Sequence, residues 1–205
     1  AGVDRLSLAI DMKIDKNGNV IDSNVFKAVI NVKKKMSYTK VYKVINRQDE
    51  KVLEEYNDYI SDIDLMRELA EILNKKRVSL GSINFDIPET KIILDEAGNV
   101  VDLKPYDITI ANKIIEEFML IANMTIAKKF FFADVPFIYR IHEKPDEEKL
   151  RNLNEILNNY NKRIKINNNL RPKVLSKILD EIEDEDEKKI VSTFMLRSLK
   201  VAKYS

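Results

Sequence analysis

The sequence contains no cysteine, no tryptophan and one histidine, and among its 205 residues it has four glycines and five prolines. The absence of cysteine excludes disulfide bonds and thiolate metal ligands, and the single histidine excludes a His-rich zinc site. A bound metal would therefore need oxygen ligands. With so few glycines and prolines, the sequence shows no long flexible linker.

An excess of charge of one sign is also missing, because 35 lysines and arginines balance 34 acidic residues. Global charge therefore does not indicate a nucleic-acid partner, and any basic surface must be local. The longest apolar run, 130–138, contains Asp134 and is far shorter than the roughly 20 residues of a membrane helix. We expect no membrane association and, without a signal peptide, a cytoplasmic location. Since the chain begins at Ala1 without methionine, we expect a piece of a longer protein.

Two β-hairpins are predicted from a repeated turn motif. The pattern D-x-x-G-N-V-[IV]-D occurs at 15–22 and again at 95–102, each time between aliphatic segments. The predicted strands are 6–14, 25–32, 91–94 and 100–103. A calcium loop is disfavoured, because that motif needs glycine at its sixth position and here glycine is fourth.

The remaining sequence is mostly helical by the spacing of its apolar residues. The predicted helices are 39–45, 50–76 with one break near Ser61, 108–130, 145–160, 172–182 and 187–203. We therefore expect an α+β fold that is mainly helical and carries two β-hairpins.

The helix predicted at 108–130 has apolar residues on nearly every side, which predicts burial on most sides. Asn112, Glu116 and Asn123 nevertheless fall within about 40° of one another on it, as one polar stripe. The stripe fits buried polar groups that join the helix to a hairpin by hydrogen bonds, or one wall of a ligand site in which Glu116 accepts from a hydroxyl. Glu117 is expected elsewhere on the helix, near Lys113, as an ordinary surface acid.

Two aromatic residues also fit more than one role. Tyr38 ends the basic run Lys33-Lys34-Lys35-Met36-Ser37-Tyr38, and Phe85 lies shortly before Pro88. Aromatic residues mostly fill cores. An aromatic ring beside lysines also suits stacking on an unpaired base while the lysines meet phosphate.

Two other chemical features favour structural roles. His142 has no serine or cysteine nucleophile in a recognisable motif near it, so a hydrolytic triad is disfavoured. The acidic run 181–187 precedes a predicted helix, where negative charge is favourable, and we interpret it as a solvated face rather than a metal site.

Six segments, in the same order along the chain, resemble the catalytic RNB domain of the RNase R and RNase II family of processive 3′→5′ exoribonucleases. They are 3–8 (VDRLSL), 35–41 (KMSYTKV), 81–85 (GSINF), 111–123 (ANKIIEEFMLIAN), 140–145 (RIHEKP) and 195–200 (MLRSLK). The segments YTKV and RIHEKP are more similar to RNase R than to RNase II.

The resemblance implies a monomeric parent enzyme that degrades single-stranded RNA to nucleoside 5′-monophosphates with magnesium. It implies that Glu116 contacts the 3′-terminal nucleotides, that Tyr38 helps to select ribose, and that Phe85 packs against bases. Asn112 and Asn123 are assigned as supports of the Glu116 face from the stripe alone.

The chain also departs from the family pattern. The family's aspartate cluster D-x5-D-x-D-D, its second stacking tyrosine and its segment with a catalytic arginine are absent from residues 1–205. We therefore expect a partial RNB domain with no catalytic or metal-binding residue, inactive alone and without bound magnesium. Uncovered channel walls would expose apolar surface, so self-association is expected. The alternative is a non-enzymatic module that binds single-stranded RNA or serves as a helical scaffold.

Overall fold

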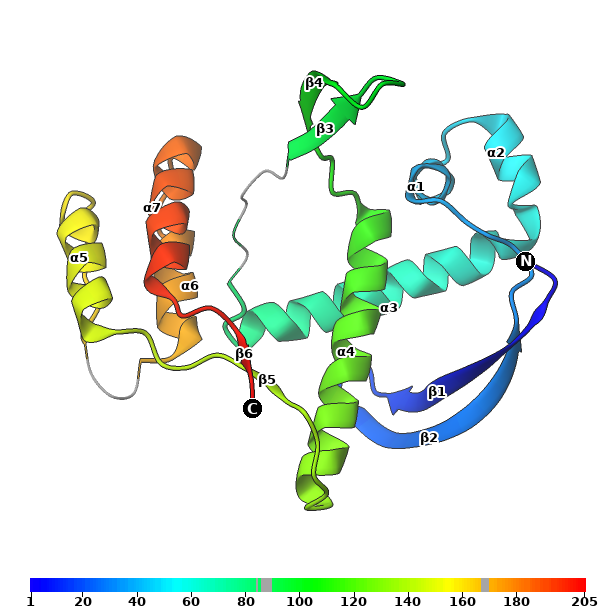
Figure 1. Cartoon of the computed structure of the whole chain (residues 1–205), viewed down its shortest axis with the longest axis horizontal. Coiled ribbons are helices and arrows are strands. Elements are labelled where there is room, and N and C mark those ends of the chain that lie inside the picture. The colour runs from blue at the N-terminus through cyan, green and yellow to red at the C-terminus, as the bar shows by residue number, and fades with distance from the viewer. Residues whose placement is uncertain (84, 86–89, 167–169) are drawn as a thin grey trace. The chain divides into compact units, whose positions relative to one another are not determined.

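The computed structural model describes residues 1–83, 85, 90–166 and 170–205. The chain divides into two compact units, and Figure 1 shows their elements. The first unit contains residues 1–76 and 108–137, and the second contains 77–107 and 138–205. The expected α+β class is confirmed, because helices predominate and the strands form small antiparallel pairs.

The first unit contains one hairpin and most of the longer helices. Its elements are β1 (Asp4–Ile14), β2 (Val20–Asn31), α1 (Tyr38–Ile45), α2 (Glu50–Glu55), the 3-10 turn η1 (Asn57–Tyr59), α3 (Ile60–Ser79, of which the last turn belongs to the second unit) and α4 (Ile110–Phe132). The break predicted near Ser61 is present, but it lies earlier, at η1.

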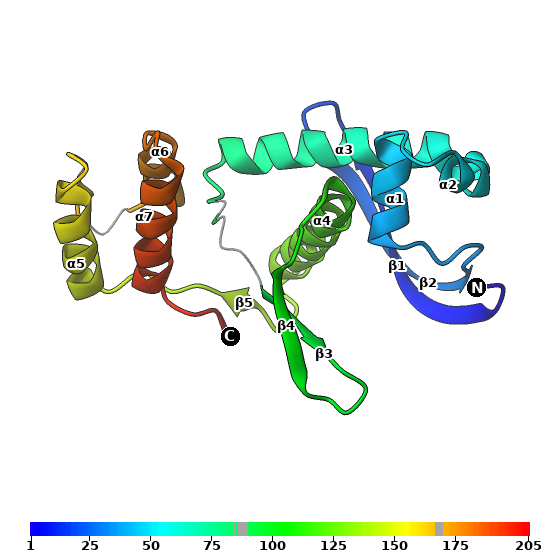
Figure 2. The ribbon, with the colours of Figure 1, turned by 90° about the horizontal axis from the view of Figure 1, so that it is seen from above.

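The core of the first unit is formed where α1, α2, α3 and α4 meet, and Figure 2 shows these helices from above. Its buried residues are Val44, Ile45, Val52, Tyr56, Ile63, Ala70 and Ile114. The prediction that 108–130 is buried on most sides is wrong for this chain. Only Ala111, Ile114 and Glu117 of α4 are buried, because its neighbours cover one face.

The turn of the first hairpin is held by one carboxylate. Asp15 Oδ1 accepts hydrogen bonds from the backbone N–H groups of Asn17 (2.9 Å) and Asn19 (2.7 Å), and Asp15 Oδ2 accepts from Asn19 Nδ2 (2.8 Å). Gly18 has φ 77°, a left-handed conformation that glycine adopts without a steric penalty.

The second hairpin, β3 (Thr90–Leu94) and β4 (Val100–Pro105), repeats this turn. Asp95 Oδ1 accepts from the backbone N–H groups of Ala97 (2.9 Å) and Asn99 (2.8 Å), and Gly98 has φ 84°. The register shifts just before both turns, at Lys13/Ile14 and at Ile93/Leu94. Both predicted hairpins are confirmed, and the repeated sequence gives a repeated geometry.

The hairpin β1–β2 exposes large apolar side chains far from its turn. Leu6 is 91% exposed, and Val29, its cross-strand partner, is 64% exposed. Leu8, which alternation places on the same face, is 75% exposed. This face of the sheet is therefore an uncovered apolar surface in the chain.

The second unit is built mainly from three short helices. Besides β3 and β4, its elements are β5 (Arg140–Ile141), α5 (Glu147–Asn158), α6 (Pro172–Asp180), α7 (Glu185–Ser198) and β6 (Lys203–Tyr204). Its buried core residues are Leu153, Leu157, Ile164, Leu175, Ile178, Leu179, Ile182, Val191 and Met195.

The last predicted helix, 187–203, is wrong at its C-terminal end. Helix α7 stops at Ser198, and Leu199 is extended (φ −78°, ψ 152°). The chain then pairs with β5, with Arg140 opposite Tyr204. A strand pair of two residues on each side, formed across about sixty positions, leaves no local sequence pattern to detect.

The turn chemistry predicts a pKa change that can be measured. The Asn19 side chain is the main cause that lowers the pKa of Asp15 from its ordinary value of 3.8, so Asn19→Ala should raise that pKa. Asn17→Ala is the matched control, because Asn17 donates only its backbone N–H to this carboxylate. Carboxyl NMR titration measures both variants, and equal pKa values in them would contradict the assignment.

The stability that these turns contribute should depend on pH with a definite sign. The pKa of Asp15 is lowered mainly by Asn19, and that of Asp95 mainly by the backbone N–H of Asn99. Lowered folded-state values mean that the stabilisation is complete above the ordinary pKa of 3.8 and is lost as pH falls through the lower folded values. Acid unfolding of Asn19→Ala should therefore begin at a higher pH than that of Asn17→Ala.

Candidate functional site

Tyr38 is the first residue of α1 and lies at the surface, with 45% of its area exposed. The helix begins there because Ser37 is extended and its Oγ accepts a hydrogen bond from the Lys40 backbone N–H (3.4 Å). The phenol is therefore accessible at the N-terminal end of a short helix. The ribose-selecting role expected for it stays a prediction.

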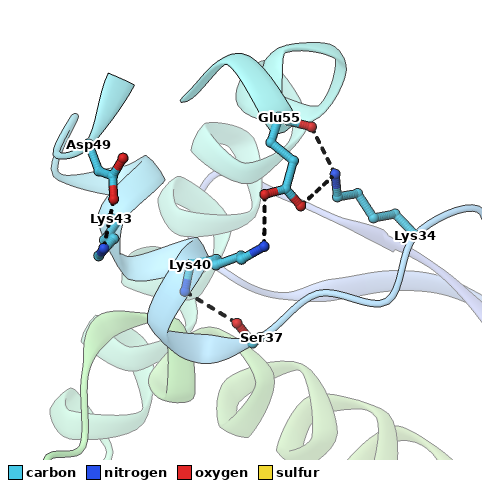
Figure 3. A network of polar contacts seen from close by, with 6 residues as sticks. All are labelled: Lys34, Ser37, Lys40, Lys43, Asp49 and Glu55. Carbon is cyan, nitrogen blue, oxygen red and sulfur yellow. Dashed lines mark hydrogen bonds and ion pairs between the residues drawn. The ribbon is translucent and has the colours of Figure 1, made fainter. Parts of the chain in front are cut away.

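A network of charged groups surrounds the start of α1 (Figure 3). Lys40 Nζ lies 2.7 Å from Glu55 Oε2, and Lys34 Nζ lies 3.2 Å from Glu55 Oε1. Lys34 also donates to the Glu55 backbone carbonyl (2.8 Å), and its ammonium lies 4.3 Å from the centre of the Tyr56 ring. Two cations thus meet at one carboxylate on the last residue of α2.

This network changes the acidity of its members. Hydrogen bonds from Lys40 and then Lys34 hold the pKa of the Glu55 carboxyl below its ordinary value of 4.5. The same contact with Glu55 raises the pKa of Lys40 above 10.5. Glu55 and Lys40 are therefore both ionised at neutral pH.

Two adjacent acids on α4 have opposite environments. Glu116 is exposed, whereas Glu117 is only 3% exposed and accepts a hydrogen bond from Asn74 Nδ2 (2.8 Å). The expectation that Glu117 is an ordinary surface acid near Lys113 is therefore wrong. Glu117 follows Ala111 and Ile114 on the covered face of the helix, and Asn74 of α3 satisfies its carboxylate there.

The polar stripe is not a buried link between α4 and a hairpin. Glu116 and Asn123 are exposed. Asn112 is partly buried, and its Oδ1 accepts from the backbone N–H (3.0 Å) and the hydroxyl (2.8 Å) of Thr109, which places it in the capping box at the start of α4. Asn112 thus has a local structural role. The ligand-wall interpretation of Glu116 and Asn123 stays a prediction.

Phe85 belongs to the second unit, where it is partly buried and packs against the core of α5, α6 and α7. Asn84 and Pro88 lie outside the described residues. Upstream, Gly81 has φ 98°, and a Cβ there would lie 2.6 Å from Lys173 backbone atoms. The segment can therefore pass the start of α6 only with glycine at this position.

His142 joins two segments of the second unit that are distant in sequence. Its Nδ1 lies 3.2 Å from the Lys200 carbonyl oxygen. Beside it, Lys203 is paired with Glu143, and Lys200 lies 2.9 Å from Asp146. These contacts tie the start of α5 to the chain after α7, in agreement with a structural role for His142.

The acidic run 181–187 begins α7, as expected. Asp184 is the N-cap and accepts from the backbone N–H groups of Asp186 (3.0 Å) and Glu187 (2.9 Å). Glu181 is paired with Lys162.

Within the described ranges, no group of three or more histidine and acidic residues could hold a metal ion. Among the helices of the described residues, none combines the length and the apolar character that a membrane span requires.

Sequence reasoning missed Glu55 and the burial of Glu117. Glu55 is separated from Lys34 by 21 positions, and Glu117 from Asn74 by 43. A period of 3.6 residues could place Glu117 with Ala111 and Ile114, but apolar residues surround α4 so evenly that the buried face has no clear signal.

Comparison with known proteins gives one consistent family. The RNB domain family model matches residues 1–205. Ribonuclease R of Thermotoga maritima is 39% identical over 205 residues, and Ribonuclease R of Aquifex aeolicus is 35% identical over 202. The chain is covered to 100% and 98%, but it spans only 29% and 28% of those proteins.

A solved structure shows the same fold. Mycoplasma genitalium RNase R in complex with ribose methylated single-stranded RNA matches with a TM-score of 0.88 at 25% identity. The match covers all of this chain and 32% of that protein.

The two acids of α4 should respond differently to truncation. Glu117→Ala leaves the Asn74 amide without its carboxylate, so the free energy of unfolding should fall by about 1–3 kcal/mol. Glu116→Ala, the adjacent control, should change it by less than about 0.5 kcal/mol because that side chain is exposed. Urea unfolding measures both variants, and equal losses would contradict the separation of roles.

Proposed function

The chain belongs to the RNB domain family, and from this membership we propose that it forms part of the RNA channel of a processive, hydrolytic 3′→5′ exoribonuclease. The enzyme would degrade single-stranded RNA to nucleoside 5′-monophosphates. The observation that carries the proposal is the family match over residues 1–205, and the exposure of Tyr38 and Glu116 within one unit supports it.

Tyr38 and Glu116 are proposed to recognise the ribose at the 3′ end. The 2′-hydroxyl both donates and accepts hydrogen bonds, and it is what distinguishes RNA from DNA. An ionised carboxylate can only accept, whereas a phenol can donate or accept. Glu116 would therefore accept a hydrogen bond from the 2′-hydroxyl, while Tyr38 could donate one to its oxygen. Asn123, exposed on the same helix, would support the Glu116 face.

Phe85 is proposed to pack against a base of the single strand. Its ring is only partly buried against the core of the second unit, so one side of it is held by the protein. Stacking would use the part of the ring that remains accessible. Base stacking on aromatic rings tolerates any sequence, which suits a processive enzyme.

Magnesium is proposed as the cofactor of the longer enzyme but not as a ligand of this chain. In such hydrolysis clustered carboxylates hold the ions that activate water. The described residues contain no such group, so their donors do not fit a magnesium site. We therefore expect this chain to bind RNA without shortening it. The second candidate function, which needs no metal site, is a non-enzymatic module that binds single-stranded RNA.

The two candidates differ in what the gene encodes outside these residues. An aspartate cluster of the form D-x5-D-x-D-D in the longer protein would favour the exoribonuclease. Its absence there would favour the binding module.

Binding should prefer RNA over DNA. We expect a fluorescent single-stranded oligoribonucleotide to bind more tightly than its deoxy counterpart in a titration with magnesium. Tyr38→Phe and Glu116→Gln should each weaken ribo-oligonucleotide binding about two- to tenfold, the effect of one lost hydrogen bond, with little change for DNA. Denaturing gels of the same samples should show oligonucleotides of unchanged length.

Matched controls separate contact from general charge or size effects. Tyr204→Phe changes an exposed tyrosine of β6, and Glu155→Gln changes an exposed acid of α5. Neither should alter the preference. Sedimentation of the same samples reports association through apolar surface. Equal affinity of the chain for both oligonucleotides would overturn the proposed ribose contacts, and shortening from the 3′ end would show that this chain holds metal ligands.

A further inference from the structure

The start of α1 needs support from outside the helix. Helix α1 has eight residues, fewer than an isolated helix needs for stability. The segment 32–37 before it has no regular secondary structure, and the Ser37 cap is a long hydrogen bond of 3.4 Å. Tyr38 lies at this junction, so local interactions alone fix its direction weakly.

Glu55 supplies contacts on both sides of this junction. Lys34 lies four positions before Tyr38 and Lys40 lies two positions after it, and both ammonium groups meet the Glu55 carboxylate, at 3.2 Å and 2.7 Å. Lys34 also binds the Glu55 carbonyl oxygen at 2.8 Å. Figure 3 shows the carboxylate between the two lysines, with Ser37 below.

The support behind Glu55 is part of a packed core. Glu55 is the last residue of α2, and the adjacent Val52 and Tyr56 are 8% and 1% exposed in the core of the first unit. Lys34 lies over the ring of the buried Tyr56. The carboxylate is therefore tied to the packed core rather than to a mobile surface segment.

The carboxylate also offsets a local excess of positive charge. Residues 33–40 contain four lysines, Lys33, Lys34, Lys35 and Lys40, and no acid. Without Glu55, repulsion between these ammonium groups would favour an opened segment. Glu55 carries its charge at neutral pH, since its pKa lies below the ordinary value of 4.5.

We propose that Glu55 is a positioning residue for Tyr38: its carboxylate holds Lys34 and Lys40 against the end of α2 and so directs the phenol toward the ribose of the bound nucleotide. This inference rests on the proposed function for its link to ribose. Its link to the order of α1 stands on the contacts of Glu55 alone.

The chain contains a matched control for this role. Asp49, the N-cap of α2, lies 2.8 Å from Lys43, which is in α1 like Lys40. The two carboxylate side chains are about equally exposed, at 35% for Asp49 and 41% for Glu55. The pair of Asp49 and Lys43 joins α2 to the other end of α1, away from Tyr38. Glu55→Gln and Asp49→Asn therefore each remove one charge that pairs with α1, and asparagine tolerates the positive φ of 69° at position 49.

The first test measures local order without RNA. In Glu55→Gln, hydrogen exchange of the Lys40 and Val41 backbone amides, which bond to Ser37, should quicken roughly three- to fivefold, the scale of lost surface ion pairs. Asp49→Asn should leave these two amides unchanged. Equal exchange in Glu55→Gln and the unsubstituted chain would overturn the positioning role, whatever the RNA result.

The second test measures the ribose preference. Glu55→Gln should lower the ratio of RNA to DNA affinity roughly threefold, and Asp49→Asn should not. Adding Glu55→Gln to Tyr38→Phe should cause no further loss, because one effect acts through the other. Additive losses would overturn the role. If the unsubstituted chain shows no ribose preference, the proposed function is overturned. The positioning role then loses its link to ribose, while the exchange test alone decides its effect on the order of α1.

Discussion

The core shared by α1, α2, α3 and α4 is the constraint on which the candidate site depends. Val44 of α1, Tyr56 after α2 and Ile114 of α4 are all at most 2% exposed in it. A short helix such as α1 gains most of its stability from such packing rather than from its own hydrogen bonds. The same packing leaves Tyr38 at the open end of α1 and Glu116 on the uncovered side of α4. Both groups are presented to solvent because they lie at positions of these helices that the core does not cover.

Charged side chains add ion pairs and hydrogen bonds to the contacts of this core. Glu55 gathers Lys34 and Lys40, while the buried Glu117 accepts from Asn74. Exposed ion pairs contribute little to global stability, and in the proposed positioning role the pairs of Glu55 fix the direction of one segment. A buried carboxylate with its hydrogen bond satisfied ties one helix to another and makes the position intolerant of truncation. The two acids thus hold α1 and α4, the helices that carry Tyr38 and Glu116.

The first hairpin carries an exposed apolar face, and the chain matches only part of the length of its relatives. Leu6, Leu8 and Val29 form an uncovered face on β1–β2, and the chain spans 29% of the Thermotoga maritima Ribonuclease R. A two-stranded hairpin has too little core to stabilise itself. The described residues likewise lack a cluster of metal ligands.

The sequence by itself determined whatever rests on neighbours within a few positions. The repeated D-x-x-G-N motif specified both hairpin turns, since Asp15 and Asp95 bond to backbone groups at most four residues away. Helical periods and caps located the helices, and the motif order gave the family. Tertiary structure alone decided that Glu117 rather than Glu116 is buried, that Glu55 meets Lys34, and that Arg140 pairs with Tyr204. Those contacts join residues 21 to 64 positions apart, and their partners are set by how helices pack, which no local pattern encodes.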